Sequence, residues 1–147
     1  MQRRVICQNR KARFDYEVLD TLEAGIVLKG SEVKSLAMGQ ASISEAYAEI
    51  RNGEVFLVGS NIARYSGASY ANHEPRRERK LLLNSKEIKR LQSKVREKGL
   101  TLIPLSIYFN ERGKAKVELA LCRGRKKYDK RERIMKRDEA RARREEV

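Results

Sequence analysis

An Asn-Gly dipeptide between two alternating runs is the feature that most constrains how this chain folds. In residues 44–62 (SEAYAEIRNGEVFLVGSNI), apolar side chains alternate with polar ones on both sides of Asn52 and Gly53. Asn-Gly suits a type I′ turn, because both central residues of that turn need a positive φ. The pattern therefore predicts an antiparallel hairpin with its turn at Asn52 and Gly53.

A second hairpin is predicted near the C-terminal end. Residues 100–109 (LTLIPLSIYF) and 114–122 (KAKVELALC) read as two apolar strands joined across Asn110 to Gly113. In this hairpin we expect Leu105, Ile107 and Phe109 to face Val117, Leu119 and Leu121. Pro104 has no N–H to donate to a neighbouring strand, so it indicates a sheet edge or a bulge.

The remaining strand and loop signals are less regular. Residues 14–28 (FDYEVLDTLEAGIVL) alternate with an interruption at Gly25, which predicts a bent strand with a bulge or corner at the glycine. Residues 64–80 mix Gly, Ser, Asn and Pro with a basic cluster and keep no period. We expect a long loop there, and long loops in small domains are often functional.

Two helices are predicted from their end signals. Val33 and Leu36 are three residues apart, which favours a short helix capped by Ser31 and ended by Gly39. Residues 84–98 form the second helix, because Asn84 and Glu87 make a capping box before an apolar stripe that Gly99 closes.

These elements favour a mainly β fold with accessory helices. Several short antiparallel strands indicate a closed or partly closed β-barrel of the oligonucleotide-binding type, and a plain β-sandwich is the competing shape. The 147 residues suffice for one domain with tails. We expect a basic N-terminal arm at 1–13, the barrel at 14–124 and a basic C-terminal tail at 125–147.

The charge favours a polyanionic partner. With 34 Lys and Arg against 20 Asp and Glu, the formal net charge is +14. Residues 3–13 carry five basic residues and no acid, and residues 123–147 carry twelve basic and six acidic residues. Charge gathered at the two ends of the chain is typical of a nucleic-acid binder.

The tail has few residues that can bury a face. Within residues 128–147, only Ile134 and Met135 are large aliphatic side chains. Such a segment is expected to be disordered alone and to become helical when phosphates neutralise it. The alternative is a solvated charged tail that aids solubility.

The sequence lacks the segments and motifs that several other classes of protein need. The chain has no apolar stretch long enough for a membrane span and no apolar segment of a signal peptide at its start, so we expect a cytoplasmic protein. Cys7 and Cys122 are expected to be free thiols, and without a CxxC motif we expect no zinc. No carboxylate cluster, paired histidine or cofactor loop indicates an enzyme, so we expect no catalytic residue, metal or cofactor. We expect His73 to be a polar group of the loop or an RNA contact.

Six segments resemble one known family in its own order. They are residues 9–18 (NRKARFDYEV), 24–36 (AGIVLKGSEVKSL), 43–65 (ISEAYAEIRNGEVFLVGSNIARY), 76–91 (RRERKLLLNSKEIKRL), 98–131 (KGLTLIPLSIYFNERGKAKVELALCRGRKKYDKR) and the basic tail. On these residues the chain resembles the family of the SsrA-binding protein, small protein B, the bacterial partner of transfer-messenger RNA.

The resemblance implies an RNA-binding adapter of trans-translation. Such an adapter grips the tRNA-like domain of transfer-messenger RNA and accompanies it into the A site of a stalled ribosome. Its tail enters the decoding centre and the empty messenger channel of the small subunit. The resemblance also suggests the GTPase elongation factor that carries charged tRNA as a partner. We also expect a monomer with no membrane contact. A ribosomal protein or initiation-type factor with an RNA-binding barrel is the alternative.

The resemblance also implies which residues meet RNA. Glu32 is placed on the RNA-contacting face, where it accepts hydrogen bonds from base edges or holds a neighbouring Arg or Lys; the alternative is a cap or ion pair on a helix surface. Lys34 then supplies positive charge and Ser35 a neutral hydrogen bond. The expected polar and phosphate contacts are Asn9, Arg10, Lys11, Arg13, Asn61, Arg79, Lys80, Lys114, Lys116, Lys126 and Lys127.

Two positions depart from the family pattern. Where the family commonly has an Arg after VKSL, this chain has Ala37, and where the family often has His before DKR, it has Tyr128. The resemblance places Tyr128, Asp129, Lys130 and Arg131 at the decoding centre, with Tyr128 stacking on a base and the two cations on phosphates. The alternative for Tyr128 is an aromatic residue at the edge of the domain.

Overall fold

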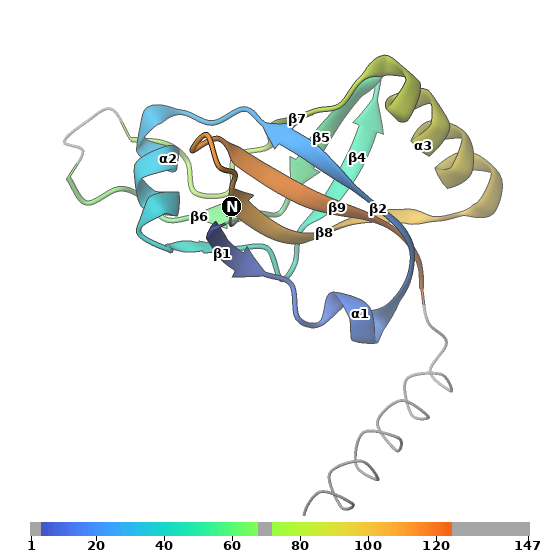
Figure 1. Ribbon diagram of the computed structural model, residues 1–147, viewed down its shortest axis with the longest axis horizontal. Helices are drawn as coiled ribbons and strands as arrows, with labels where there is room; N and C mark the ends of the chain where they lie inside the picture. Colours follow the sequence, from blue (N-terminus) through green and yellow to red (C-terminus); the bar gives the residue numbers. More distant parts are fainter. Residues whose placement is uncertain (1–3, 68–71, 125–147) are drawn as a thin grey trace, which may run out of the picture.

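An antiparallel sheet that curls into a ring dominates the computed structural model, which describes residues 4–67 and 72–124 (Figure 1). Within those residues the sheet has seven strands, β1 (Arg4–Gln8), β2 (Tyr16–Ile26), β4 (Tyr47–Arg51), β5 (Glu54–Val58), β7 (Arg79–Leu82), β8 (Thr101–Phe109) and β9 (Ala115–Gly124). A small second sheet pairs β3 (Ala41–Ser42) with β6 (Asn61–Ile62), and the helices are α1 (Ala12–Asp15), α2 (Gly30–Ala37) and α3 (Ser85–Lys98).

The strand order closes the ring. It runs β1-β8-β4-β5-β7-β2-β9, and β9 pairs back with β8. Since β9 occupies one edge of β8, β4 and β1 share the other edge, β4 at Leu102 and β1 from Ser106 to Phe109. The predicted mainly β barrel with accessory helices is confirmed, and the β-sandwich is not what forms.

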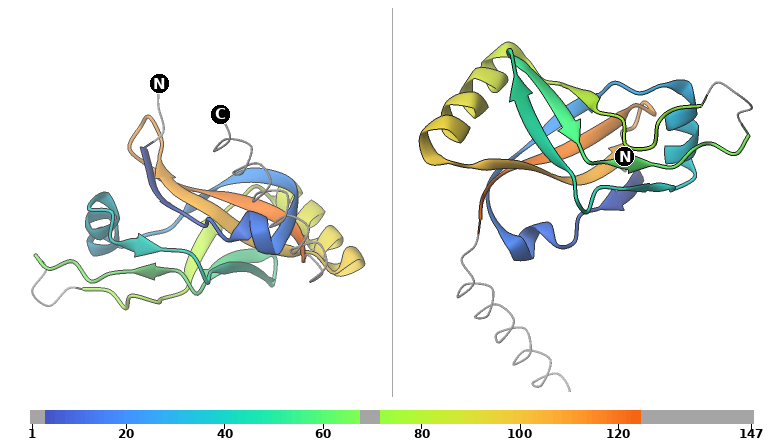
Figure 2. Two further views of the ribbon diagram at one scale, coloured as in Figure 1. Left: turned by 90° about the horizontal axis from the view of Figure 1, so that it is seen from below. Right: turned by 180° about the vertical axis from the view of Figure 1, so that it is seen from behind.

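The ends of the long axis carry different helices. In Figure 1 and in both views of Figure 2, α2 lies at one end of the ring and α3 at the other. The turn between β8 and β9 points toward the α2 end, and β9 runs from there toward the opposite end of the ring. No helix within the described residues is long and apolar enough to cross a membrane.

Both hairpins are confirmed. Arg51 pairs with Glu54 across Asn52 and Gly53, whose φ values are 51° and 75°, as a type I′ turn requires. In the second hairpin Ile107 faces Val117, which is one pairing between the two expected sets, whereas Phe109 faces Ala115. A bulge between Pro104 and Ser106 then shifts the register, so Leu119 faces Pro104 and Leu121 faces Leu102. A sheet edge or a bulge was predicted at the proline, and a bulge is what forms; its effect on the facing pairs was not predicted.

The second helix is confirmed and the first begins differently. Asn84 accepts a hydrogen bond from the Glu87 N–H, and Gly99 ends α3 at a φ of 61°. By contrast, α2 begins at Gly30, and the carboxylate of Glu32 accepts the N–H of Lys29. Ser31 therefore does not cap α2, because its hydroxyl bonds elsewhere.

The N-terminal residues depart from the expected arm. From Arg4 to Gln8 they form β1, which pairs with β8, because Ile6 and Cys7 are partly buried against the core. The helix α1 was not predicted, and it places Ala12 against the outer face of β8 and β9. Strong charge around these short apolar runs concealed both elements.

Gly25 marks a corner of the ring. It pairs with Lys116 of β9 on one side and with Leu82 of β7 on the other. A Cβ atom added at Gly25 would lie 3.2 Å from the Leu82 Cβ, so a side chain there would crowd the point where the two neighbours meet. The predicted corner is confirmed, and a separate bulge lies between Val18 and Asp20.

Two groups of buried side chains hold the sheet together. The main core fills the ring with residues such as Leu57, Leu81, Ile107 and Leu119, and α3 covers it through Leu91. A smaller group, around Ile103 and Cys122, lies under α1. Cys7 and Cys122 are free thiols, as predicted, and burial raises the pKa of Cys122 to about 11 against a weaker opposing effect of Arg13.

Candidate nucleic-acid interface

A fully buried carboxylate organises the α2 end of the molecule. Glu32 lies in the first turn of α2, and none of its side chain is exposed. Its Oε1 accepts the Lys29 N–H at 2.7 Å and Arg77 Nη2 at 2.6 Å, and its Oε2 accepts Arg79 Nε at 2.6 Å. Burial by itself raises the pKa of Glu32, but hydrogen bonds from Arg77, Lys29 and Arg79 outweigh it and lower the pKa.

Arg79 extends this cluster into the loop before β7. Its guanidinium is fully buried and donates to Ser60 Oγ at 3.0 Å, to the Arg77 carbonyl at 2.9 Å and to the Pro75 carbonyl at 3.1 Å. Burial lowers the pKa of Arg79, and the attraction of Glu32 opposes that shift. The pair therefore ties α2, the β5–β6 turn and the segment before β7 to one another.

Burial changes the roles expected for three residues. Glu32, Ser35 and Arg79 have no exposed side chain, so in this conformation they have no surface to present to an RNA base or phosphate. The direct contacts expected of them are corrected on that ground. Of the roles considered for Glu32, holding neighbouring arginines fits the structure, although the site is buried and not on a helix surface.

His73 holds the loop before β7 in place through two further hydrogen bonds. Its Nε2 lies 2.8 Å from the carbonyl oxygen of Ile62, which can only accept a hydrogen bond, so Nε2 carries the proton. Nδ1, 2.8 Å from the Ser31 Oγ, then accepts from that hydroxyl. His73 is 2% exposed. It is thus a buried polar group of the loop, one of the two roles considered from the sequence.

Next to this cluster lies an apolar hollow with lysines beside it. It has a volume of about 330 Å³ and forms where β2, α2, β7 and the β8–β9 hairpin meet. Its lining includes Ile26, Leu28, Val33, Leu82, Phe109, Lys114 and Lys116. Val33 and Leu82 are 39% and 52% exposed, so apolar surface is open to a ligand beside two cations. Bases and riboses offer apolar faces between phosphates, which is the chemistry such a surface fits.

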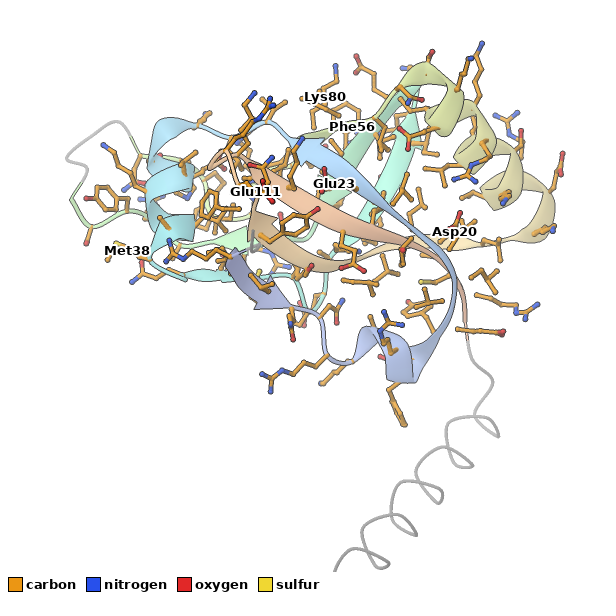
Figure 3. The ribbon with its side chains drawn as sticks, in the orientation of Figure 1. Asp20, Glu23, Met38, Phe56, Lys80 and Glu111 are labelled. Carbon is orange, nitrogen blue, oxygen red and sulfur yellow. The ribbon has the colours of Figure 1, made fainter. Side chains whose placement is uncertain are left out.

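Lys80 and Lys34 add charge at this end. Lys80 points away from β7, as Figure 3 shows, and its Nζ lies 3.1 Å from Glu54 Oε1 in an exposed ion pair. Lys34 on α2 places its Nζ 5.5 Å from the centroid of the Tyr65 ring. Asn61 on β6 is exposed. These residues keep the surface positions that an RNA contact needs.

The structure places a second predicted group elsewhere, around β1 and α1. Arg10 and Arg13 line a cavity of about 270 Å³ with Asn9, and Lys11 is exposed beside them. Asn9 is 8% exposed, and its Nδ2 donates to the Ile43 carbonyl at 3.2 Å. Among the described residues its Oδ1 has no hydrogen-bond partner. The contacts predicted from the sequence thus form two clusters and not one.

Several of the predicted contact residues lie in a part of the chain that the structure does not describe. Lys126, Lys127, Tyr128, Asp129, Lys130 and Arg131 lie outside the described residues. At Ala37, where the family commonly has Arg, the backbone carbonyl accepts a hydrogen bond from Arg4 Nη2 at 2.6 Å. A guanidinium from β1 is therefore present beside the position that lacks one.

The apolar part of the α2-end surface was not predicted. Residues 64–80 were expected to form a loop, whereas Arg79 and Lys80 begin β7, in which Arg79 and Leu81 are buried and Lys80 and Leu82 are exposed. The signal was the run Leu81 to Leu83, which is too uniform to show which member faces outward.

Together, the closed antiparallel ring, the net charge of +14 and the lysine-flanked apolar hollow are typical of a nucleic-acid-binding β-barrel. Comparison with known proteins gives the family. The model of the SmpB protein family matches residues 6–147, and the chain belongs to this family.

Similar proteins and a solved structure support the assignment to this family. The chain is 59% identical to the SsrA-binding protein of Syntrophobacter fumaroxidans, over 94% of this chain and 85% of the relative. It is 57% identical to the SsrA-binding protein of Rhizobium etli, over 92% and 85% of the two chains. A chain of the solved structure called "tmRNA-SmpB: a journey to the center of the bacterial ribosome" matches with a TM-score of 0.67 and 52% identity, over 87% of this chain and 93% of that one.

Proposed function

We propose that this protein is the RNA-binding adapter of trans-translation, which binds the tRNA-like domain of transfer-messenger RNA and brings it to the A site of stalled ribosomes. Its family, and relatives whose name says that they bind SsrA, support this function. A solved neighbour whose name joins tmRNA, SmpB and the bacterial ribosome supports the two partners. The observation that carries the proposal is the lysine-flanked apolar hollow at the α2 end.

The RNA contact is proposed to combine two chemistries. Lys114 and Lys116, with Lys34 and Lys80 nearby on the same end, neutralise phosphates collectively. Leu82 and the other exposed apolar groups of the hollow pack against ribose or base faces, which gives shape selectivity that charge alone does not supply.

Glu32, Ser35 and Arg79 support this surface from below. Glu32 and Arg79 hold α2 against the segment that leads into β7, so they fix the positions of Lys34 and Lys80 relative to each other. We assign them a positioning role and no contact with the RNA. Asn9, Arg10, Lys11 and Arg13 form a second polar contact region beside β1 and α1, and Asn61 an additional polar contact.

The tail is proposed to meet the ribosome. Lys126 and Lys127 continue the basic surface, Tyr128 stacks on a base of the decoding centre, and Asp129, Lys130 and Arg131 lie in the same stretch. Residues 132–147 then enter the empty messenger channel and become helical there. We propose that the protein works in the cytoplasm as a monomer, without a cofactor or a catalytic step, and that the elongation factor that carries charged tRNA accompanies the complex.

A competition titration tests the function. The full chain is titrated with transfer-messenger RNA in the presence of excess bulk tRNA at two salt concentrations, because salt weakens phosphate attraction more than shape recognition. We expect tight binding that survives competitor and salt. Equal, weak and salt-sensitive binding of both RNAs would instead favour a ribosomal protein or initiation-type factor.

Matched variants test the surface. The double variant Lys114→Gln, Lys116→Gln should weaken binding and reduce the salt dependence, because two phosphate contacts are lost. The control is Lys89→Gln, Lys94→Gln on α3, which makes the same change in net charge at the other end of the molecule. If both double variants weakened binding equally, the α2 end would not be the specific site.

A further inference from the structure

Arg4 lies next to the lysine-flanked hollow, although it was not among the contacts expected from the sequence. It is the first residue of β1 and pairs directly with Phe109 of β8, and Phe109 lines the hollow. Directly paired residues of antiparallel strands project from the same face of a sheet. The side chain of Arg4 therefore leaves β1 on the same side as that of Phe109.

The guanidinium of Arg4 caps the C-terminal end of α2. Its Nη2 donates to the Ala37 carbonyl at 2.6 Å. The three carbonyls before that of Ala37 accept N–H groups of residues 38–40, which follow the helix directly. The contact thus supplies a donor to the last carbonyl of α2, and it holds a guanidinium in a fixed place on an exposed surface.

This contact leaves most of the binding capacity of Arg4 unused. A carbonyl group is neutral, so it does not cancel the positive charge. Within residues 4–67 and 72–124, no carboxylate forms an ion pair with Arg4, whereas Lys80 on the same end pairs with Glu54. A guanidinium carries several N–H donors in a planar fork, which matches the oxygen atoms of a phosphate.

The charge of Arg4 matters because of where it lies. The C-terminal end of a helix carries roughly half a negative charge, which repels a phosphate. Arg4 places a full positive charge at this end of α2, and Lys34, three residues before Ala37, adds another in the last turn. Met38, the next residue after α2, is 56% exposed and offers apolar surface to a ribose or base.

We infer that Arg4 binds a phosphate of transfer-messenger RNA at the C-terminal end of α2. The inference rests on the proposed function and deepens it, because it extends the RNA surface from the hollow to the first strand of the chain. If Arg4 served only as a cap of α2, its charge would have no part in RNA binding. The salt dependence of binding separates the two roles.

Arg4→Gln in the full chain tests the charge. Glutamine keeps an NH₂ group that can donate to the Ala37 carbonyl, but it carries no charge. We expect binding of transfer-messenger RNA to weaken on the order of tenfold at low salt, and the slope of log affinity against log salt to fall by about one. The midpoint of urea denaturation should stay at the wild-type value. Arg96→Gln is the control, since Arg96 is an exposed arginine of α3 at the other end of the molecule, and it should change neither affinity nor slope appreciably.

A second variant tests the position of the charge. Ala37→Arg, placed in the Arg4→Gln chain, returns a guanidinium to the same end of α2 from the helix itself. Ala37 is partly exposed, so a longer side chain can reach the surface there. We expect this double variant to recover most of the lost affinity and the wild-type slope. A double variant that binds no better than Arg4→Gln would place the phosphate elsewhere and overturn the inference.

Two further results would overturn the inference. In the first, Arg4→Gln lowers the urea midpoint and keeps the wild-type slope, which leaves Arg4 only its structural role as a cap. In the second, Arg4→Gln and Arg96→Gln weaken binding equally, so that net charge alone matters. Both results require a wild-type chain that prefers transfer-messenger RNA over bulk tRNA. A wild type without that preference would overturn the proposed function, and this inference with it.

Discussion

Glu32 on α2 and Arg79 on β7 form an ion pair that is buried completely, with Arg79 Nε 2.6 Å from Glu32 Oε2. The two residues are 47 positions apart in the sequence. Arg77 shares the carboxylate, and Ser60 Oγ and carbonyl groups of the loop before β7 accept other N–H donors of Arg79. Because each charge is compensated only by this arrangement, loss of one partner leaves the other buried without its counterpart.

The first prediction concerns stability. Arg79→Met should lower the free energy of unfolding by about 3–5 kcal/mol, because Glu32 keeps only Arg77 as a cationic partner. Urea denaturation at pH 7 measures the change. The control is Arg90→Met, which breaks the half-exposed pair of Arg90 Nη2 and Asp20 Oδ2 at 3.3 Å and should cost less than about 1 kcal/mol. Similar losses in the two variants would contradict the importance of burial.

The second prediction concerns the stability of the fold at low pH. Since the pKa of folded Glu32 lies below its ordinary value of 4.5, ionised Glu32 stabilises the fold above that pH. This contribution is lost as the pH falls from about 4.5 through the lower pKa of the folded state. The difference in unfolding free energy between the wild type and Glu32→Gln should therefore be largest at neutral pH and shrink below pH 4.5. Urea denaturation from pH 7 to pH 3 measures this difference. A difference that is constant with pH would show that ionisation of Glu32 does not stabilise the fold.

The third prediction separates apolar from charged recognition. Leu82→Ser should weaken binding of transfer-messenger RNA about tenfold, or ~1.4 kcal/mol, with little change in salt dependence. The change should barely affect stability, because Leu82 is 52% exposed. Leu19→Ser is the matched control, since Leu19 is 44% exposed on β2 and does not line the hollow. Fluorescence titration gives the affinities, and equal effects of the two variants would argue against a specific role of the hollow.

The fourth prediction divides the chain by task. Removal of residues 132–147 should leave binding of transfer-messenger RNA largely intact and abolish tagging on stalled ribosomes, because the barrel holds the RNA surface and the tail meets the messenger channel. A binding titration and a translation assay with a stalled message measure the two activities. Loss of binding to the isolated RNA would show that the tail belongs to the RNA site.

Local signals made several elements predictable. A type I′ turn needs two positive φ values, and Asn52-Gly53 supplies both; a common helix end places a glycine in the left-handed region, and Gly99 takes that position in α3. Such requirements act over a few residues, so the sequence displays them. The bulge at Pro104 belongs to the same class, because a missing N–H is a local property.

The arrangement of the RNA-binding surface could not be predicted from such local signals. Within RRERK, Arg79 is indistinguishable from a solvated basic residue, and only its position across from Glu32 in the folded ring makes it buried. The same holds for Leu82, whose exposure depends on the face of β7 that the ring turns outward. Charge composition predicted the kind of partner, whereas pairings between distant segments decided which residues meet it.

The pairing of β1 with β8 also bears on the order in which the protein is made. Val5 pairs with Tyr108, and the ring closes only when β9 pairs with β8 and β2. A nascent chain emerges from its N-terminus, so β1 and β2 leave the ribosome long before the strands that complete their pairing. The closing contacts join residues about 100 positions apart, which makes folding slow compared with that of locally connected domains. During synthesis, the apolar faces of the first strands therefore stay without these partners until the last third of the chain has been made.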